Sequence, residues 1–188
     1  MLKSDDLINK VKSYNKFLNP ETLSKAYDFA LKAHKTQKRD EGVPYIIHPI
    51  AVASILTELK LDSATIATGL LHDTIEDVDG TTEAKLATLF GSTIAALVQG
   101  VTNISQYPLQ PHRRTEQRQA ENYLKLLLAT AKDVRVILIK LADRLYNMET
   151  LNFVRPEKQR RIAKETMDIY VPIASRMGIY KIKAELED

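Results

Sequence analysis

Apolar residues recur at the spacing of an α-helix along most of the chain, and proline or glycine separates the segments. Pro20 is typical of the first turn of a helix, and Asp62 or Ser63 is placed to cap another. We expect polar loops at residues 38–44 and 103–112. The helices that this pattern predicts cover residues 2–18, 22–35, 49–61, 64–77, 81–90, 93–101, 113–131 and 156–176.

One further segment is ambiguous. Residues 134–139, Val-Arg-Val-Ile-Leu-Ile, could form a buried strand on propensity alone. Their continuation, residues 140–151, has strong helical character, and the rest of the chain offers no second good strand to pair with. We therefore expect a buried helix here, and an all-α fold for the whole chain.

Acidic residues crowd the end of one predicted helix. If residues 64–77 form a continuous helix, Glu76 lies about 40°, Asp73 about 100° and Asp77 about 140° around the axis from His72. The helix dipole disfavours anions at this end by about 0.3–1 kcal/mol each, and a bound cation would reverse that penalty. The alternative is a solvated acidic turn beside a core histidine. We favour a site because four polar residues share one face.

Two residues elsewhere could complete a metal site with His72 and Asp73. His48 follows an apolar run and precedes a proline, which would hold it rigidly; by itself it could equally be a core histidine. Asp143 follows a buried-looking run; by itself it could form a salt bridge to Arg144 or to a neighbouring helix. Two imidazoles and two carboxylates together indicate metal-assisted hydrolysis of a phosphate compound.

The donor types indicate which metal is suitable. Imidazole and carboxylate ligands without a thiolate suit Mn²⁺ or Fe²⁺ better than a structural zinc ion. The remaining histidines are weaker candidates. His34 lies on an apolar stripe and is expected in the core, and His112 has no evident partner in the sequence.

Composition narrows the class of protein. The 188 residues are 44% hydrophobic and 27% charged, which fits one soluble domain over residues 1–188. No segment reads as a membrane span or a secretory signal. The absence of cysteine fits the cytoplasm. A net charge of +3 tolerates an anionic ligand. The chain lacks the dense basic stripe that is typical of a nucleic-acid binder. We therefore expect no nucleic-acid and no membrane partner, and the oligomeric state is left open.

Four stretches resemble the hydrolase domain of RelA/SpoT-homologue proteins, within the HD superfamily of metal phosphohydrolases. The His-Asp pair alone is a weak signal, whereas the order and spacing of the stretches are specific. The resemblance covers about residues 20–180 and continues to the end of the chain. The matching stretches are residues 42–49, 70–77, 140–148 and 170–179.

The resemblance implies a single HD-type helical domain of roughly eight to ten helices around a metal site. It implies Mn²⁺-dependent hydrolysis of the 3′-diphosphate of the guanine nucleotide alarmone (p)ppGpp to GDP or GTP and pyrophosphate, although another divalent metal is possible. Carried over by position, the roles fall into three groups. The metal ligands would be His48, His72, Asp73 and Asp143, the catalytic acids Glu76 and Asp77, and the substrate-binding residues Arg39, Arg144, Asn147 and Thr150.

Several alternatives stay open at this point. Asp40, Tyr146 and Glu149 depart from the family pattern near the expected nucleotide pocket, which bears on substrate preference. The chain could hydrolyse another nucleotide, such as an adenine alarmone, or it could be a non-catalytic nucleotide sensor. It could also be a stand-alone hydrolase or a piece of a longer bifunctional enzyme.

Overall fold

The described part of the chain is helical. The computed structural model describes residues 3–106, 124, 126, 128 and 132–188. Among these residues the backbone forms helices and a single isolated antiparallel bridge, between Lys38 and Pro44, with no strand. The predicted all-α class is confirmed. The chain separates into two compact units, Met1–Gln106 and Tyr107–Asp188. That residues 1–188 form one domain stays a prediction.

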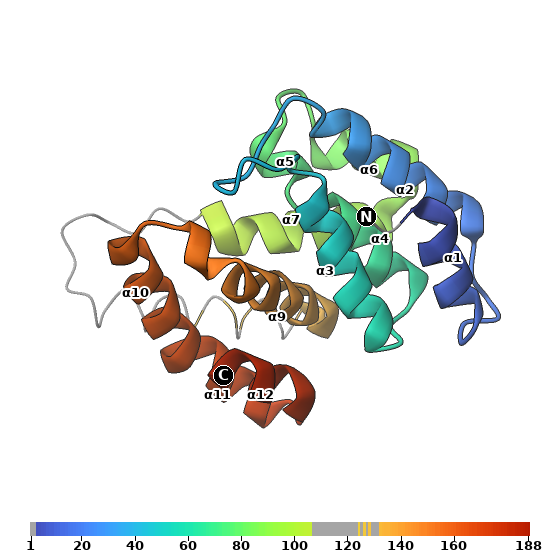
Figure 1. Ribbon diagram of the computed structural model, residues 1–188. Helices are drawn as coiled ribbons and strands as arrows, with labels where there is room; N and C mark the ends of the chain where they lie inside the picture. Colours follow the sequence, from blue (N-terminus) through green and yellow to red (C-terminus); the bar gives the residue numbers. More distant parts are fainter. Residues whose placement is uncertain (1–2, 107–123, 125, 127, 129–131) are drawn as a thin grey trace. The chain divides into compact units, whose positions relative to one another are not determined.

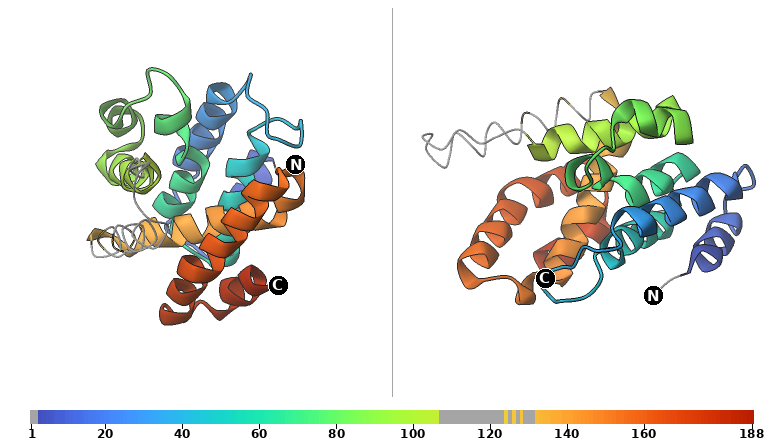
Figure 2. Two further views of the ribbon diagram at one scale, coloured as in Figure 1. Left: turned by 90° about the vertical axis from the view of Figure 1, so that its left-hand side faces the viewer. Right: turned by 90° about the horizontal axis from the view of Figure 1, so that it is seen from above.

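The first unit is built around one largely buried helix. All of α4 from Thr65 to Leu71 is buried, and this helix packs against α2, α3 and α7 (Figures 1 and 2). Asp62 caps it, because its carboxylate accepts hydrogen bonds from the backbone N–H groups of Ala64 and Thr65. The helices of this unit are α1 (Ser4–Lys12), α2 (Pro20–Ala33), α3 (Ile47–Glu58), α4 (Ser63–Leu71), α5 (Thr74–Asp77), α6 (Glu83–Phe90) and α7 (Ser92–Gln106).

A glycine allows α3 and α4 to approach closely. A Cβ atom on Gly69 of α4 would lie 2.6 Å from Leu56 Cδ1 and 3.4 Å from Ala53 Cα, both on α3. Only a residue without a side chain fits this contact unless the neighbours shift. The contact matters for function because α3 carries His48 and α4 ends beside His72.

The predicted continuous helix over residues 64–77 is wrong. Helix α4 ends at Leu71, His72 and Asp73 form a turn, and a separate short helix, α5, covers Thr74–Asp77. The Thr74 hydroxyl donates a hydrogen bond to the Leu71 carbonyl, which competes with continuation of the helix. The angles computed around one axis therefore do not describe this segment, and Glu76 and Asp77 belong to the first turn of α5.

The second unit confirms the buried helix at the ambiguous segment. Residues 134–149 form α9, and Ile137, Ile139 and Leu141 of this helix are fully buried. Asp133 caps its start by accepting a hydrogen bond from the Arg135 backbone N–H. The elements of this unit are α9 (Val134–Glu149), η1 (Leu151–Phe153), α10 (Pro156–Glu165), η2 (Thr166–Tyr170), α11 (Val171–Arg176) and α12 (Tyr180–Glu187).

The predicted helix over residues 156–176 contains a wide turn. Its middle part, η2, is π-helical. Pro172 follows after Val171; it lacks an N–H group, and its ring would clash with the carbonyl four residues earlier in an α-helix. A local widening of the helix accommodates such a proline. The turn places the Tyr170 ring under the Arg144 guanidinium, 4.2 Å from its carbon to the ring centroid.

Other boundaries differ from the sequence prediction. The first helix covers only Ser4–Lys12 of the expected 2–18. Helix α7 runs to Gln106 and so occupies part of the loop predicted at 103–112, the rest of which lies outside the described residues. Most of the helix predicted at 113–131 also lies outside them. Helix α12 was not predicted.

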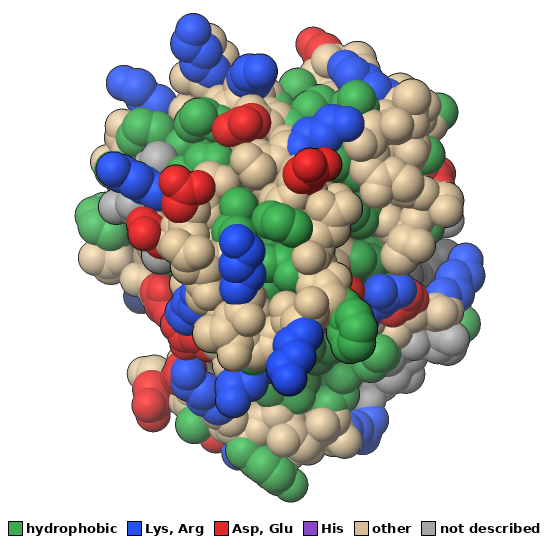
Figure 3. Space-filling model, turned by 90° about the vertical axis from the view of Figure 1, so that its right-hand side faces the viewer, with side chains coloured by type: hydrophobic (Ala, Val, Ile, Leu, Met, Phe, Trp, Pro, Cys, Tyr) green, Lys and Arg blue, Asp and Glu red, His purple; other side chains and the backbone are tan. Residues whose placement is uncertain are grey.

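Charged and apolar side chains share the face of the molecule drawn in Figure 3. Lysine, arginine and acidic side chains are interspersed on the face drawn in Figure 3, where no described histidine is visible. This agrees with the burial of His34, His48 and His72. Among the described residues, no helix combines the length and the apolar character needed to span a bilayer.

Candidate metal centre

His48 lies in the first turn of α3 and is only 2% exposed. Pro49 follows it within the same turn, where the missing N–H of proline costs no helical hydrogen bond. Ile46 and Ile50 on either side are buried and anchor this turn in the core. The sequence prediction of a rigidly positioned histidine therefore agrees with its placement.

His72 is the residue directly after α4, and its ring orientation is fixed by the backbone. Its Nδ1 atom lies 2.9 Å from the carbonyl oxygen of Gly69. A carbonyl oxygen only accepts, so Nδ1 carries the proton and the lone pair of the neutral ring is at Nε2. Such a contact to the second ring nitrogen is the usual support of a metal-binding histidine.

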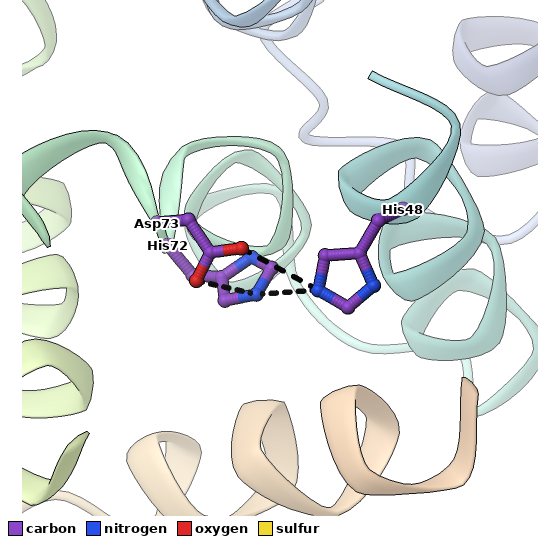
Figure 4. A group of neighbouring side chains, drawn as sticks. All are labelled: His48, His72 and Asp73. Carbon is purple, nitrogen blue, oxygen red and sulfur yellow. Dashed lines mark hydrogen bonds and ion pairs between the residues drawn. The ribbon is translucent and has the colours of Figure 1, made fainter. Parts of the chain in front are cut away.

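Three ligating groups converge at one point (Figure 4). The Nε2 atoms of His48 and His72 lie 3.2 Å apart. The Asp73 carboxylate lies 3.1 Å from the Nε2 atom of His72 and 3.4 Å from that of His48. The donor atoms of these three residues all lie within 4.8 Å of one another.

The cluster fits a divalent cation. Ligands about 2.1 Å from a metal and at right angles to each other lie about 3.0 Å apart, close to the separations of these donor atoms. In the neutral ring of His72 the lone pair at Nε2 faces a carboxylate. A cation held between the three groups would convert this repulsion into attraction. His48, His72 and Asp73 therefore form a candidate site for a divalent metal.

A tyrosine hydroxyl connects the cluster to an acid of α5. Tyr45 Oη lies 2.6 Å from Asp73 Oδ2 and 3.1 Å from Asp77 Oδ2. Burial raises the pKa of the Tyr45 phenol above its ordinary value, and the charges of Asp73 and Asp77 raise it further, so the hydroxyl remains a donor. Asp77 is accessible to solvent, yet partial burial of its carboxyl raises its pKa, and the charge of Asp73 adds to the rise.

Asp143, the fourth ligand expected from the sequence, lies in α9 of the second unit. It is 8% exposed. Its carboxylate accepts hydrogen bonds from Lys140 Nζ and Asn147 Nδ2, each at 2.7 Å. The sequence alternative was a salt bridge to Arg144 or to a neighbouring helix, whereas the ion pair described here is with Lys140 of the same helix. Its role as a metal ligand stays a prediction.

The expected substrate-binding residues are placed as follows. Arg39 lies in a turn closed by its own backbone bonds to Val43 and Gly42, and its Nε lies 3.5 Å from Glu41. Arg144 stacks on Tyr170, as described above, and pairs with Glu165 at 3.2 Å. Asn147 holds Asp143, and the Thr150 hydroxyl donates to a backbone carbonyl at the end of α9. Their nucleotide contacts stay predictions.

The sequence analysis missed Tyr45 and Gln37. Tyr45 stands three residues before His48 in one of the matching stretches, but its sequence context does not reveal where its hydroxyl points. Gln37 lies in the preceding loop, and its side chain donates a hydrogen bond to the backbone carbonyl of Asp77 at 2.7 Å. His34, expected in the core, is 1% exposed.

The model of the HD domain family matches residues 26–180. The chain belongs to the HD domain family. In this HD domain the matched range contains all the histidines and acids of the predicted site. The chain is similar to full-length relatives as well. It is 52% identical over 178 residues to a GTP pyrophosphokinase of Myxococcus xanthus, covering 95% of this chain and 23% of the relative.

Two further relatives carry the name of a hydrolase. The HD domain is 52% identical over 168 residues to the guanosine-3′,5′-bis(diphosphate) 3′-pyrophosphohydrolase of Aquifex aeolicus, covering 89% of this chain and 23% of the relative. It is 51% identical over 166 residues to a probable enzyme of the same name from Synechocystis, covering 88% and 21%. The chain thus spans less than a quarter of the length of these relatives. The resemblance to RelA/SpoT homologues is confirmed.

The fold also has a solved counterpart. A metazoan SpoT orthologue, described as hydrolysing ppGpp and playing a role in starvation responses, superposes with a TM-score of 0.72. The match covers 91% of this chain and 94% of the other at 24% identity. At that identity the likeness supports the HD-type fold.

Proposed function

We propose that this HD domain hydrolyses the 3′-diphosphate of (p)ppGpp, giving GDP or GTP and pyrophosphate. The observation that carries the proposal is the convergence of His48, His72 and Asp73 on one point. Two relatives about half identical to the chain bear the name of this hydrolase. We propose a cytoplasmic location, because the proposed substrate is a soluble nucleotide and the chain contains no cysteine.

We propose Mn²⁺ as the metal of this site. His48, His72 and Asp73 would hold it, with Asp143 as the proposed fourth ligand. Nitrogen and oxygen donors without a thiolate favour Mn²⁺ or Fe²⁺ over a structural zinc ion. A divalent cation held there supplies Lewis-acid chemistry, which makes water nucleophilic at neutral pH and withdraws charge from a phosphate oxygen.

Glu76 and Asp77, the acids of α5, are the proposed proton-transfer residues. Asp77 shares the Tyr45 hydroxyl with Asp73, so a second carboxylate lies within one hydroxyl group of the metal ligand. We assign Glu76, helped by Asp77, to orient the attacking water and accept its proton. A new bond forms between the water oxygen and the phosphorus next to the ribose. The bond from that phosphorus to the ribose 3′ oxygen breaks, and this oxygen takes up a proton.

Arg39 is the proposed contact to the base. Its guanidinium can stack on a purine and contribute a cation–π interaction. Backbone hydrogen bonds to Gly42 and Val43 fix the turn that carries Arg39. This turn shortly precedes the proposed metal ligand His48 in the sequence. We assign Arg144, Asn147 and Thr150 to the remaining nucleotide contacts.

Incubation with ppGpp and Mn²⁺ tests the function directly. We expect stoichiometric GDP and pyrophosphate, and no product when EDTA is present. A panel that contains pppGpp, an adenine alarmone and GTP, assayed under the same conditions, defines the substrate. Tight binding of ppGpp without pyrophosphate release would assign a sensor in place of an enzyme. Turnover of the adenine alarmone alone would assign a different nucleotide.

A further inference from the structure

Tyr45 connects the metal cluster to Asp77. Its hydroxyl is within hydrogen-bond distance of two carboxylates, Asp73 at 2.6 Å and Asp77 at 3.1 Å. Asp73 follows α4 directly and Asp77 ends α5, so the hydroxyl spans the whole turn that replaces a continuous helix. A phenol has one proton to donate, and it therefore serves one carboxylate at a time and couples the two.

The ring of Tyr45 is held on two sides by histidines. Its centroid lies 4.8 Å from that of His34 and 5.7 Å from that of His48, the second contact being edge-on. His34 is buried and hydrogen-bonded to the Gln37 side chain. Such packing leaves the hydroxyl little freedom to leave the two carboxylates.

Further hydrogen bonds close the loop of residues 37–45 and connect it to α5. The Tyr45 N–H donates to the Gln37 carbonyl at 3.0 Å, and the Gln37 side chain donates to the Asp77 carbonyl at 2.7 Å. The loop of residues 37–45, which carries Arg39, is thus tied to α5 by a side chain at each end. This arrangement is more than a core contact, because the side-chain hydrogen bonds of Tyr45 and Gln37 end at Asp73 or Asp77.

We propose that Tyr45 is a positioning residue. Its hydroxyl orients Asp73 for the metal and holds Asp77 beside it, so that one side chain sets the distance from ligand to acid. This inference rests on the proposed function of the site. Without the hydroxyl, Asp73 loses a charge-assisted hydrogen bond, and both carboxylates are left to repel each other.

The test compares Tyr45→Phe with Tyr14→Phe. The Tyr14 hydroxyl donates to the Leu61 carbonyl at 3.1 Å in the same unit, so the control also loses one tyrosine hydrogen bond. Electron paramagnetic resonance of free Mn²⁺ gives the metal affinity, and steady-state kinetics give kcat and KM for ppGpp. We expect Tyr45→Phe to bind Mn²⁺ about 10–100-fold more weakly, the usual effect of losing an outer contact to a ligand.

The kinetic readout separates positioning from stability. At saturating Mn²⁺ we expect Tyr45→Phe to keep the wild-type KM while kcat falls, because Asp77 is no longer held. Tyr14→Phe should match wild type in metal affinity and kcat. Wild-type Mn²⁺ affinity and kcat in Tyr45→Phe would overturn the proposal, as would equal losses in both variants, which indicate a general effect on stability.

Failure of the function is distinguishable from failure of this inference. If the wild type binds Mn²⁺ but releases no pyrophosphate, the proposed function fails, and the Mn²⁺ affinity of Tyr45→Phe still decides the role of Tyr45. If the wild type hydrolyses ppGpp and Tyr45→Phe does so equally well at every Mn²⁺ concentration, the inference alone fails.

Discussion

The carbonyl oxygen of Gly69 decides which nitrogen of His72 faces the metal site. By accepting the Nδ1 proton at 2.9 Å, it fixes the tautomer and points Nε2 toward His48 and Asp73. The support comes from the backbone and from no side chain. The ligand set therefore depends on the geometry of the last turn of α4 as much as on the identity of the residues.

Asp143 is the proposed ligand most open to test. We expect Asp143→Asn to weaken Mn²⁺ binding by more than the roughly 10–100-fold that an outer contact costs, because an amide is a poor ligand beside two imidazoles. Asp133→Asn, the same chemical change at the cap of the same helix, serves as control, since asparagine also caps well. A lower free energy of unfolding with unchanged Mn²⁺ affinity would assign Asp143 a structural role, through its contacts with Lys140 and Asn147.

Glu76 is the proposed proton acceptor. Glu76→Gln keeps the size of the side chain and removes its basicity. We expect Mn²⁺ and ppGpp to bind as in the wild type while kcat falls by about 10²–10⁴-fold, the usual contribution of a general base. Single-turnover kinetics with ppGpp measure this loss. A variant with a nearly normal rate would refute the assignment.

At the residue scale, the sequence predicts ligands better than it predicts their supports. His48, His72 and Asp73 stand out as polar residues in apolar surroundings, and the structure brings them together. The Tyr45 hydroxyl contacts Asp73, which is 28 positions away in the sequence. The Gln37 amide contacts Asp77, which is 40 positions away. Contacts of that range depend on tertiary packing, which no local pattern encodes.

Among the helices, the close contact of α3 and α4 sets the separation of the two histidines. Gly69 of α4 faces Ala53 and Leu56 of α3 with no side chain between them. A wider separation would move His48, on α3, away from His72, at the end of α4. The glycine thus links helix packing to metal binding.

Gly69→Ala tests that link. Alanine favours a helix by up to about 1 kcal/mol relative to glycine, but overpacking costs about 1–3 kcal/mol. We expect weaker Mn²⁺ binding and a lower free energy of unfolding, measured by metal titration and by chemical denaturation. The double variant Gly69→Ala/Leu56→Val gives the new methyl group room and should recover Mn²⁺ affinity. Unchanged binding in the single variant would show that the close contact is not required.

At the scale of elements, the sequence predicts helices better than it predicts their ends. The apolar stripes locate α2, α3 and α9, and the lack of a partner strand correctly favours a helix at residues 134–149. The break after Leu71 was missed because residues 64–77 contain no proline and only one glycine, which lies inside α4. The π-helical turn before Pro172 depends on the same kind of local hydrogen-bond detail.

For the molecule as a whole, metal binding and folding should be coupled. The candidate ligands come from separate elements, so an unfolded chain cannot bring them together. A ligand that binds only the folded state stabilises it by about 2.7 kcal/mol at a concentration 100 times its Kd. The relatives that share this HD domain are about four times as long as the chain, and their names, GTP pyrophosphokinase and guanosine-3′,5′-bis(diphosphate) 3′-pyrophosphohydrolase, refer to those whole proteins.

Thermal unfolding measures this coupling. For a chain of this size about 1 kcal/mol corresponds to a Tm shift of about 2–4 °C, so Mn²⁺ at 100 times its Kd should raise Tm by roughly 5–11 °C. EDTA should remove the increase, and His48→Gln should not show it. An equal increase in His48→Gln would place the stabilising ion elsewhere on the protein.

The most direct test of the account is to follow pyrophosphate release from ppGpp while Mn²⁺ is titrated into metal-free protein. The account predicts that the rate rises in proportion to bound Mn²⁺, saturates at one ion per chain and stays at background in His72→Ala. Release of pyrophosphate without any metal, or full Mn²⁺ occupancy of the wild type without release, would contradict it.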